Sequence, residues 1–88
     1  MNLELQVIET KQETHDVKSI KLGLKEKIDY KPGQYLIVEL DINDHENTRP
    51  LSIASSPTED FLLFSTKISQ SAFKQEFNSL KVGDIVKI

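Results

Sequence analysis

The chain has no cysteine and only three glycines in its 88 residues. Without cysteine it cannot form a disulfide bond, a thiolate metal site or a cysteine nucleophile. Its glycines, at positions 23, 33 and 83, stand too far apart for a G-x-G-x-x-G loop. That loop and its βαβ unit are the usual way to bind a dinucleotide, so the sequence predicts no domain of that kind.

Long hydrophobic runs are also missing. No apolar stretch approaches the length of about 18 residues that a membrane-spanning helix needs. The first residues do not combine a basic start with an apolar stretch, so they do not resemble a signal peptide. The net charge is −3, which disfavours a nucleic-acid backbone as partner. These absences predict a cytoplasmic protein with no membrane span and no nucleic-acid partner.

The composition is that of a folded domain. Hydrophobic residues make up 38% of the chain and charged residues 28%, which is typical of globular proteins. A chain of this length has room for one modest core, so we expect a single domain over residues 1–88.

Most of the chain has the pattern of β-strands. Polar and apolar residues alternate in 3–7 and again from Ile20 to Leu24, as in half-buried strands. The run 35–40 is rich in β-formers and is predicted to be buried on both faces at its centre. Further strands are expected at 51–54, 61–68 and 85–88.

One segment has helical spacing. Phe73, Phe77 and Leu80 recur on one helical face, Ser71 is a suitable N-cap, and Gly83 can form the turn that follows. Six strands with one short helix before the last predict an all-β, mainly antiparallel Greek-key barrel. A β-sandwich is the competing architecture.

The segment Arg49-Pro50-Leu51-Ser52 carries the chemistry. Arginine presents a planar fork of donors suited to phosphate, and the Ser52 hydroxyl can donate or accept a hydrogen bond. We expect both to face one surface and to hold an anion and a polar ring edge there. A short buried strand entered through a charged loop is the alternative interpretation.

With Tyr30-Lys31-Pro32-Gly33-Gln34-Tyr35 upstream and Leu80-Lys81-Val82-Gly83-Asp84 downstream, the chain resembles the flavin-binding barrel of the ferredoxin–NADP reductase family. The resemblance runs from Leu3 to Ile88, and the arginine-to-serine motif is its specific part. It implies that FAD, or FMN, is the cofactor.

The resemblance also implies roles for individual residues. Arg49 would neutralise the flavin phosphates, while Ser52, the expected catalytic residue, would hydrogen-bond the ring near N5. The remaining cofactor-binding residues would be Pro50, Leu51, Thr66, Lys67, Ser71 and Ala72. Ser71 and Ala72 begin the helix, where unpaired backbone N–H groups and the helix dipole favour an anion.

The chain departs from the family pattern at three places. Leu51 stands where most relatives have a tyrosine stacked on the ring, and Ile68 where many have a glycine. Past Ile88 the family continues into a domain that binds NAD(P)H. We therefore expect a flavin-binding domain of an NAD(P)H-dependent oxidoreductase that is not catalytically complete alone. Its partners would be an NAD(P)-binding domain or chain and an iron–sulfur or haem electron acceptor.

Other functions have less support. A small barrel that binds no flavin is the main alternative, and an oligonucleotide-binding barrel fits the acidic charge poorly. His15 and His45 lie far apart in the sequence, and Asp41, Asp44 and Glu46 lack the spacing of a calcium loop, so no metal site is predicted.

Overall fold

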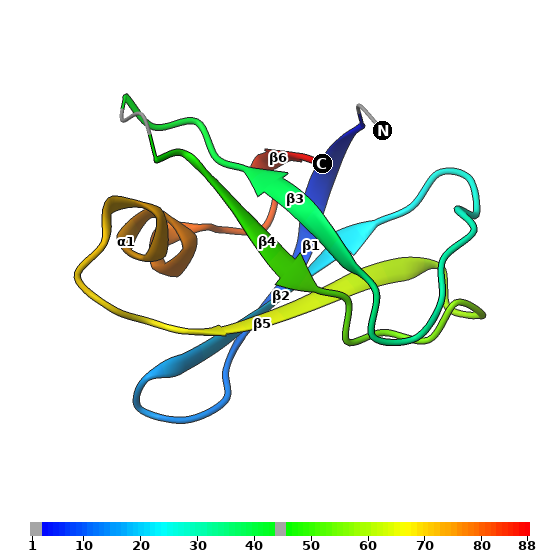
Figure 1. Cartoon of the computed structure of the whole chain (residues 1–88), viewed down its shortest axis with the longest axis horizontal. Helices are drawn as coiled ribbons and strands as arrows, with labels where there is room; N and C mark the ends of the chain where they lie inside the picture. The colour runs from blue at the N-terminus through cyan, green and yellow to red at the C-terminus, as the bar shows by residue number, and fades with distance from the viewer. Residues whose placement is uncertain (1–2, 44–45) are drawn as a thin grey trace.

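The computed structural model describes residues 3–43 and 46–88 of the chain. These residues form one six-stranded antiparallel sheet and one helix that precedes the last strand, which confirms the all-β class (Figure 1). In chain order the elements are β1 (Glu4–Gln12), β2 (Val17–Gly23), β3 (Tyr35–Glu39), β4 (Thr48–Ser52), β5 (Phe61–Lys67), α1 (Ala72–Ser79) and β6 (Ile85–Lys87).

The order of the strands leaves the barrel open on one side. Across the sheet it is β4-β3-β6-β1-β2-β5, so β4 and β5 are the two edges and share no ladder. Beyond the end of β4, the backbone N–H of Ala54 donates to the carbonyl of Leu63 on β5 at 2.8 Å. Toward the start of β4 the two edges diverge, and α1 lies on that side (Figure 1).

The interior is apolar and includes two side chains of α1. Phe73 and Phe77 are fully buried, with ring centroids 6.4 Å apart. Burial of aromatic rings contributes strongly to the stability of a domain this small. The sheet supplies most other fully buried side chains, among them Val7, Ile20, Leu22, Val38, Leu62, Phe64 and Val86.

Two glycines form the turns expected from the sequence. Gly33 and Gly83 have φ angles of 81° and 102°, in the left-handed region that side chains with a Cβ rarely adopt. Gly33 lies just before β3, and Gly83 lies between α1 and β6. Backbone hydrogen bonds between Leu3 and Ile88 run in both directions, at 3.2 Å and 2.8 Å, and hold the two chain ends side by side.

Two expectations from the sequence were wrong in detail. The strand predicted at 51–54 is β4, which begins earlier, at Thr48. Its ladder with β3 starts there, where Thr48 pairs with Glu39. The centre of β3 is not buried on both faces. Val38 points inward and is fully buried, but Ile37 points to the outer face of β3 and is 50% exposed.

Within the described ranges, no helix is long and apolar enough to cross a membrane. In the same part of the chain, no group of three or more His, Cys, Asp or Glu side chains is placed to hold a metal ion. Asp44 and His45 lie outside the described residues.

Candidate functional site

Arg49 links the edge strand β4 to the helix. Its guanidinium carbon lies 5.7 Å from the centroid of the Phe73 ring on α1, within range of a cation–π contact. One guanidinium nitrogen is 3.5 Å from a carboxylate oxygen of Glu46, a pair on the surface that contributes little to stability. The side chain is 31% exposed, so it is held in place yet remains open to a ligand.

The first turn of α1 faces the same region. Ser71 is the N-cap, and its hydroxyl accepts the backbone N–H of Lys74 at 3.2 Å. The N–H groups of Ala72 and Phe73 have no partner inside the helix, because the first amides of a helix precede its hydrogen-bond ladder. They and the positive end of the helix dipole favour an anion at this point.

Lys74 adds a second cation that the sequence analysis missed. Its ammonium donates to the hydroxyl of Thr66, which is buried, and to the carbonyl of Lys67 at 3.1 Å. Burial, together with the positive charge of Arg49, lowers the pKa of Lys74 below its ordinary value of 10.5. The two cations therefore destabilise each other until an anion lies near both.

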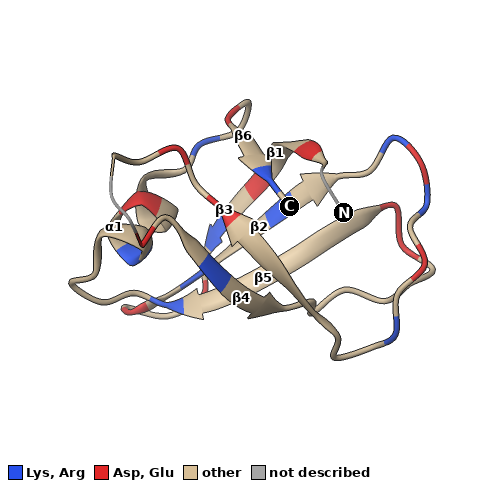
Figure 2. Ribbon diagram, turned by 45° about the horizontal axis from the view of Figure 1, so that its top comes forward, with Lys and Arg blue, Asp and Glu red and all other residues tan. Residues whose placement is uncertain are grey.

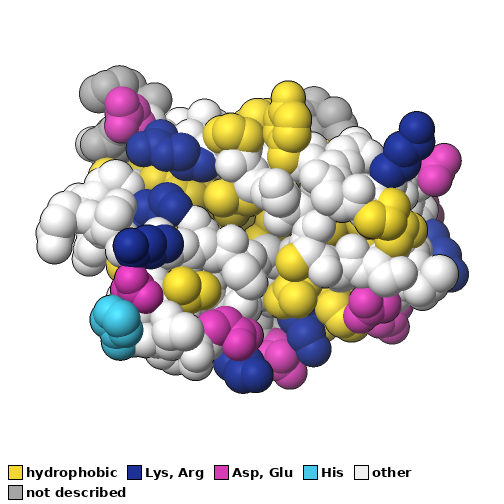
Figure 3. Space-filling model, turned by 60° about the horizontal axis from the view of Figure 1, so that its bottom comes forward, with side chains coloured by type: hydrophobic (Ala, Val, Ile, Leu, Met, Phe, Trp, Pro, Cys, Tyr) yellow, Lys and Arg dark blue, Asp and Glu magenta, His cyan; other side chains and the backbone are white. Residues whose placement is uncertain are grey.

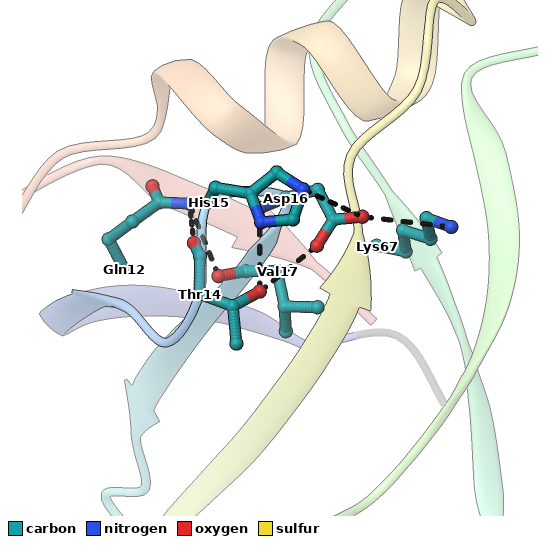
Figure 4. A network of polar contacts seen from close by, with 6 residues as sticks. All are labelled: Gln12, Thr14, His15, Asp16, Val17 and Lys67. Atoms are coloured by element: carbon teal, nitrogen blue, oxygen red, sulfur yellow. Dashed lines mark hydrogen bonds and ion pairs between the residues drawn. The ribbon is translucent and has the colours of Figure 1, made fainter.

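Lys67 is partly neutralised by the turn between β1 and β2. Its ammonium lies 3.6 Å from a carboxylate oxygen of Asp16, and His15 approaches the same oxygen at 3.8 Å (Figure 4). Thr14 donates a hydrogen bond to Asp16 at 3.0 Å. That bond is the main reason why the pKa of Asp16 lies below its ordinary value. The Asp16 carboxylate thus offsets part of the charge of Lys67, as the Glu46 carboxylate does for Arg49.

We call this region the cationic end of the fold. It brings together five residues from three elements: Arg49, Thr66, Lys67, Ser71 and Lys74. Figure 2 shows the basic positions of β4, β5 and α1 at the same end of the sheet. In Figure 3 dark-blue side chains gather on one part of the displayed face, beside a cyan histidine. Arg49, Thr66, Lys67 and Ser71 were all singled out in the sequence, and the structure places them together.

Ser52 lies away from the cationic end. Ser52 lies three residue steps along the strand from Arg49, or about 10 Å. Side chains alternate along a strand, so Arg49 and Leu51 face one side of β4 while Pro50 and Ser52 face the other. The expectation that Arg49 and Ser52 share one surface was therefore wrong, because their spacing is odd. A ligand that meets both must run along the open edge of β4.

The surface beside Ser52 is apolar. Tyr35 on β3 pairs directly with Ser52 and is 62% exposed, and Ile37 pairs with Pro50 and is 50% exposed. Leu51 is only 8% exposed and belongs to the core, so it presents little area to a ligand. Sequence analysis did not connect Tyr35 with Ser52, because that contact depends on the register between β3 and β4.

The residues present suit a ligand with charged phosphates at one end and a flat ring at the other. Two mutually repelling cations and free helix amides match a diphosphate. The exposed apolar strip with the Ser52 hydroxyl matches a ring with a polar edge. The strand length between the two regions suits an elongated dinucleotide such as FAD.

Several solved structures have a similar fold. A ferredoxin reductase in carbazole 1,9a-dioxygenase is 28% identical, with a TM-score of 0.86 over 99% of this chain and 28% of that one. The cytochrome b5 reductase domain of Ulva prolifera nitrate reductase is 18% identical, with a TM-score of 0.84 over 99% of this chain and 39% of that one.

A ferredoxin NADP+ reductase from Neisseria gonorrhoeae, solved with bound FAD and NADP, is also similar. It is 18% identical, with a TM-score of 0.82 over 98% of this chain and 35% of that one. The chain thus spans well under half the length of these three structures. No curated protein matches it in sequence. Residues 4–88 match the family described as "Oxidoreductase FAD-binding domain", and the chain belongs to that family.

Proposed function

We propose that this FAD-binding domain holds the diphosphate of FAD at its cationic end. Arg49 and Lys74 would neutralise the phosphate charges, while Ser71 and the amides of Ala72 and Phe73 would complete the cradle. Thr66 would keep Lys74 in place, and Lys67 would border the diphosphate. The observation that carries this proposal is that Arg49 of β4 lies 5.7 Å from the ring of Phe73 in the first turn of α1, next to Lys74. Burial and the charge of Arg49 lower the pKa of Lys74, and an anion near both cations would offset their repulsion.

The ring would lie along the open edge of β4. Ser52 would hydrogen-bond the flavin near N5, and Pro50 would contribute apolar surface together with Tyr35. Leu51 stands where most relatives have a tyrosine. It is buried in the core and would pack beneath this surface. Apolar burial needs no aromatic ring, so the leucine still favours binding.

The domain would work as one half of an NAD(P)H-dependent oxidoreductase. A bound flavin supplies hydride and electron-transfer chemistry, and the protein orients it and tunes its surroundings. We infer that an NAD(P)-binding domain, in the same or another chain, would bring NAD(P)H to the flavin as the hydride donor. The acceptor would be an iron–sulfur or haem protein, which is supported by the ferredoxin and cytochrome b5 reductases among the similar structures. The cytoplasmic location stays a prediction.

Substitution of Arg49 tests the phosphate assignment. A hydrogen bond to a charged group contributes about 1.5–3 kcal/mol, so Arg49→Ala should weaken FAD binding by roughly 10- to 150-fold. Lys87→Ala is the matched control, because it removes one cation from β6, where Lys87 lies 3.9 Å from Glu39. FAD fluorescence titrations of the three proteins give the dissociation constants. Equal loss in both variants, or no loss in Arg49→Ala, would contradict the assignment.

A further inference from the structure

A buried lysine outside the ligand-facing surface stands out. Lys18 lies on β2 and is 8% exposed. Because side chains alternate along a strand, it shares the inward face with Ile20 and Leu22, where an apolar residue is usual. A charged group in such a position needs compensation from polar partners.

Those partners are at the far end of α1. The Lys18 ammonium donates to the carbonyl of Asn78 and, at 3.1 Å, to that of Leu80. The last carbonyls of a helix have no partner inside it and form the negative end of the helix dipole. Burial lowers the pKa of Lys18, because removing the ammonium from water disfavours its charged form. These carbonyls replace that water and are themselves satisfied.

Hydrogen bonds from two lysines thus connect the two ends of α1 to the same part of the sheet. Lys74, in the first turn, bonds to Thr66 and Lys67 on β5. Lys18, bonded to the last turn, is the direct register partner of Thr66 across β2 and β5. An eight-residue helix is about 12 Å long, so only about two helical turns separate the contacts of Lys18 from those of Lys74.

We propose that Lys18 is a positioning residue for the phosphate end of the FAD site. It contacts no ligand and acts through α1, by holding the helix so that its first turn faces Arg49. This inference rests on the proposed assignment of the phosphates to the cationic end. It adds that FAD binding requires a residue outside the site, which holds α1 in position.

The test compares Lys18→Met with Lys21→Met. Both remove one cation from β2, but Lys21 bonds to Glu9 of β1 at 3.2 Å and lies on the opposite face of β2 from Lys18. We expect Lys18→Met to fold and to weaken FAD binding by roughly tenfold, as if α1 were in place for about a tenth of the time. Amide hydrogen exchange should become faster in α1 while β2 and β5 are unchanged. Lys21→Met should change neither, and Lys18→Arg should keep most of the affinity.

The absence of native cysteine allows a chemical rescue. Lys18→Cys can be alkylated in denaturant with 2-bromoethylamine, which restores an ammonium of nearly the same length, or with iodoacetamide, which does not. After refolding, only the aminoethylated protein should recover FAD affinity and slow exchange in α1.

Three results would overturn the inference. These are wild-type affinity in Lys18→Met, an equal loss in Lys21→Met, or a failure of Lys18→Met to fold, which would make Lys18 a general core residue. Failure of the underlying assignment is distinct, since Arg49→Ala would then bind FAD as tightly as the wild type.

Discussion

The charge of Lys74 gives the sharpest prediction. In the free protein, burial and the charge of Arg49 lower the pKa of Lys74. A bound diphosphate stabilises the protonated amine and raises that pKa again. FAD affinity should therefore be constant at pH values below the lowered pKa and should fall as the pH rises through it. Binding of FAD at that pH takes up protons.

The matching perturbation is Lys74→Met, which keeps the length and apolar stem of the side chain. Loss of one charge-assisted hydrogen bond should weaken FAD binding at pH 7 by roughly 10- to 150-fold. The variant should also lose the alkaline part of the pH dependence, because the titrating group is gone. Titrations followed by FAD fluorescence between about pH 6 and 10 measure both effects, and Lys81→Met serves as control.

Two outcomes would refute this reasoning. One is a Lys74→Met variant that binds FAD as tightly as the wild type at pH 7. The other is an unchanged pH profile in the variant, which would mean that another group, or the flavin itself, causes the alkaline loss.

Two further predictions concern the fold that supports the site. Phe77→Ala should destabilise the domain by about 3–5 kcal/mol, because it opens a cavity under α1; urea unfolding measures this, and a change below 1 kcal/mol would contradict the packing. Gly33→Ala should cost about 1–2 kcal/mol from backbone strain alone, because its φ is 81° and no atom lies near the added Cβ. Gly23→Ala is the comparison, because its added Cβ would lie 3.2 Å from Ile8 while its φ is ordinary. The melting temperatures of the two variants separate backbone strain from steric crowding.

Local patterns in the sequence predict much of this fold. Alternation identifies β1 and β2, and the spacing of Phe73 and Phe77 identifies α1. Gly33 and Gly83 mark two turns correctly because their left-handed φ angles favour glycine. The open side between β4 and β5 could not be predicted, because strand pairing depends on contacts between distant segments.

The site was predicted in part for a similar reason. Arg49 and Ser71 belong to a recognisable motif. Lys74, in contrast, looks like a solvated residue of an amphipathic helix, and only the structure brings it near Arg49. Lys18 lies on the same face of its strand as Ile20 and Leu22, so the sequence indicates that it points inward. Nothing in the neighbouring sequence indicates that its ammonium bonds to the last turn of α1. Such contacts between distant segments require the folded structure.

The most direct test of the account is the set of backbone amide chemical-shift changes in a 15N-labelled sample on addition of FAD. Assignment of the diphosphate to the cationic end predicts the largest changes at Ala72, Phe73 and Lys74, with a second group at Ser52 and Tyr35. Inorganic pyrophosphate should reproduce the first group without the second. Changes that avoid α1 and cluster on the outer face of β1 and β2, around Glu9 and Lys21, would contradict the account.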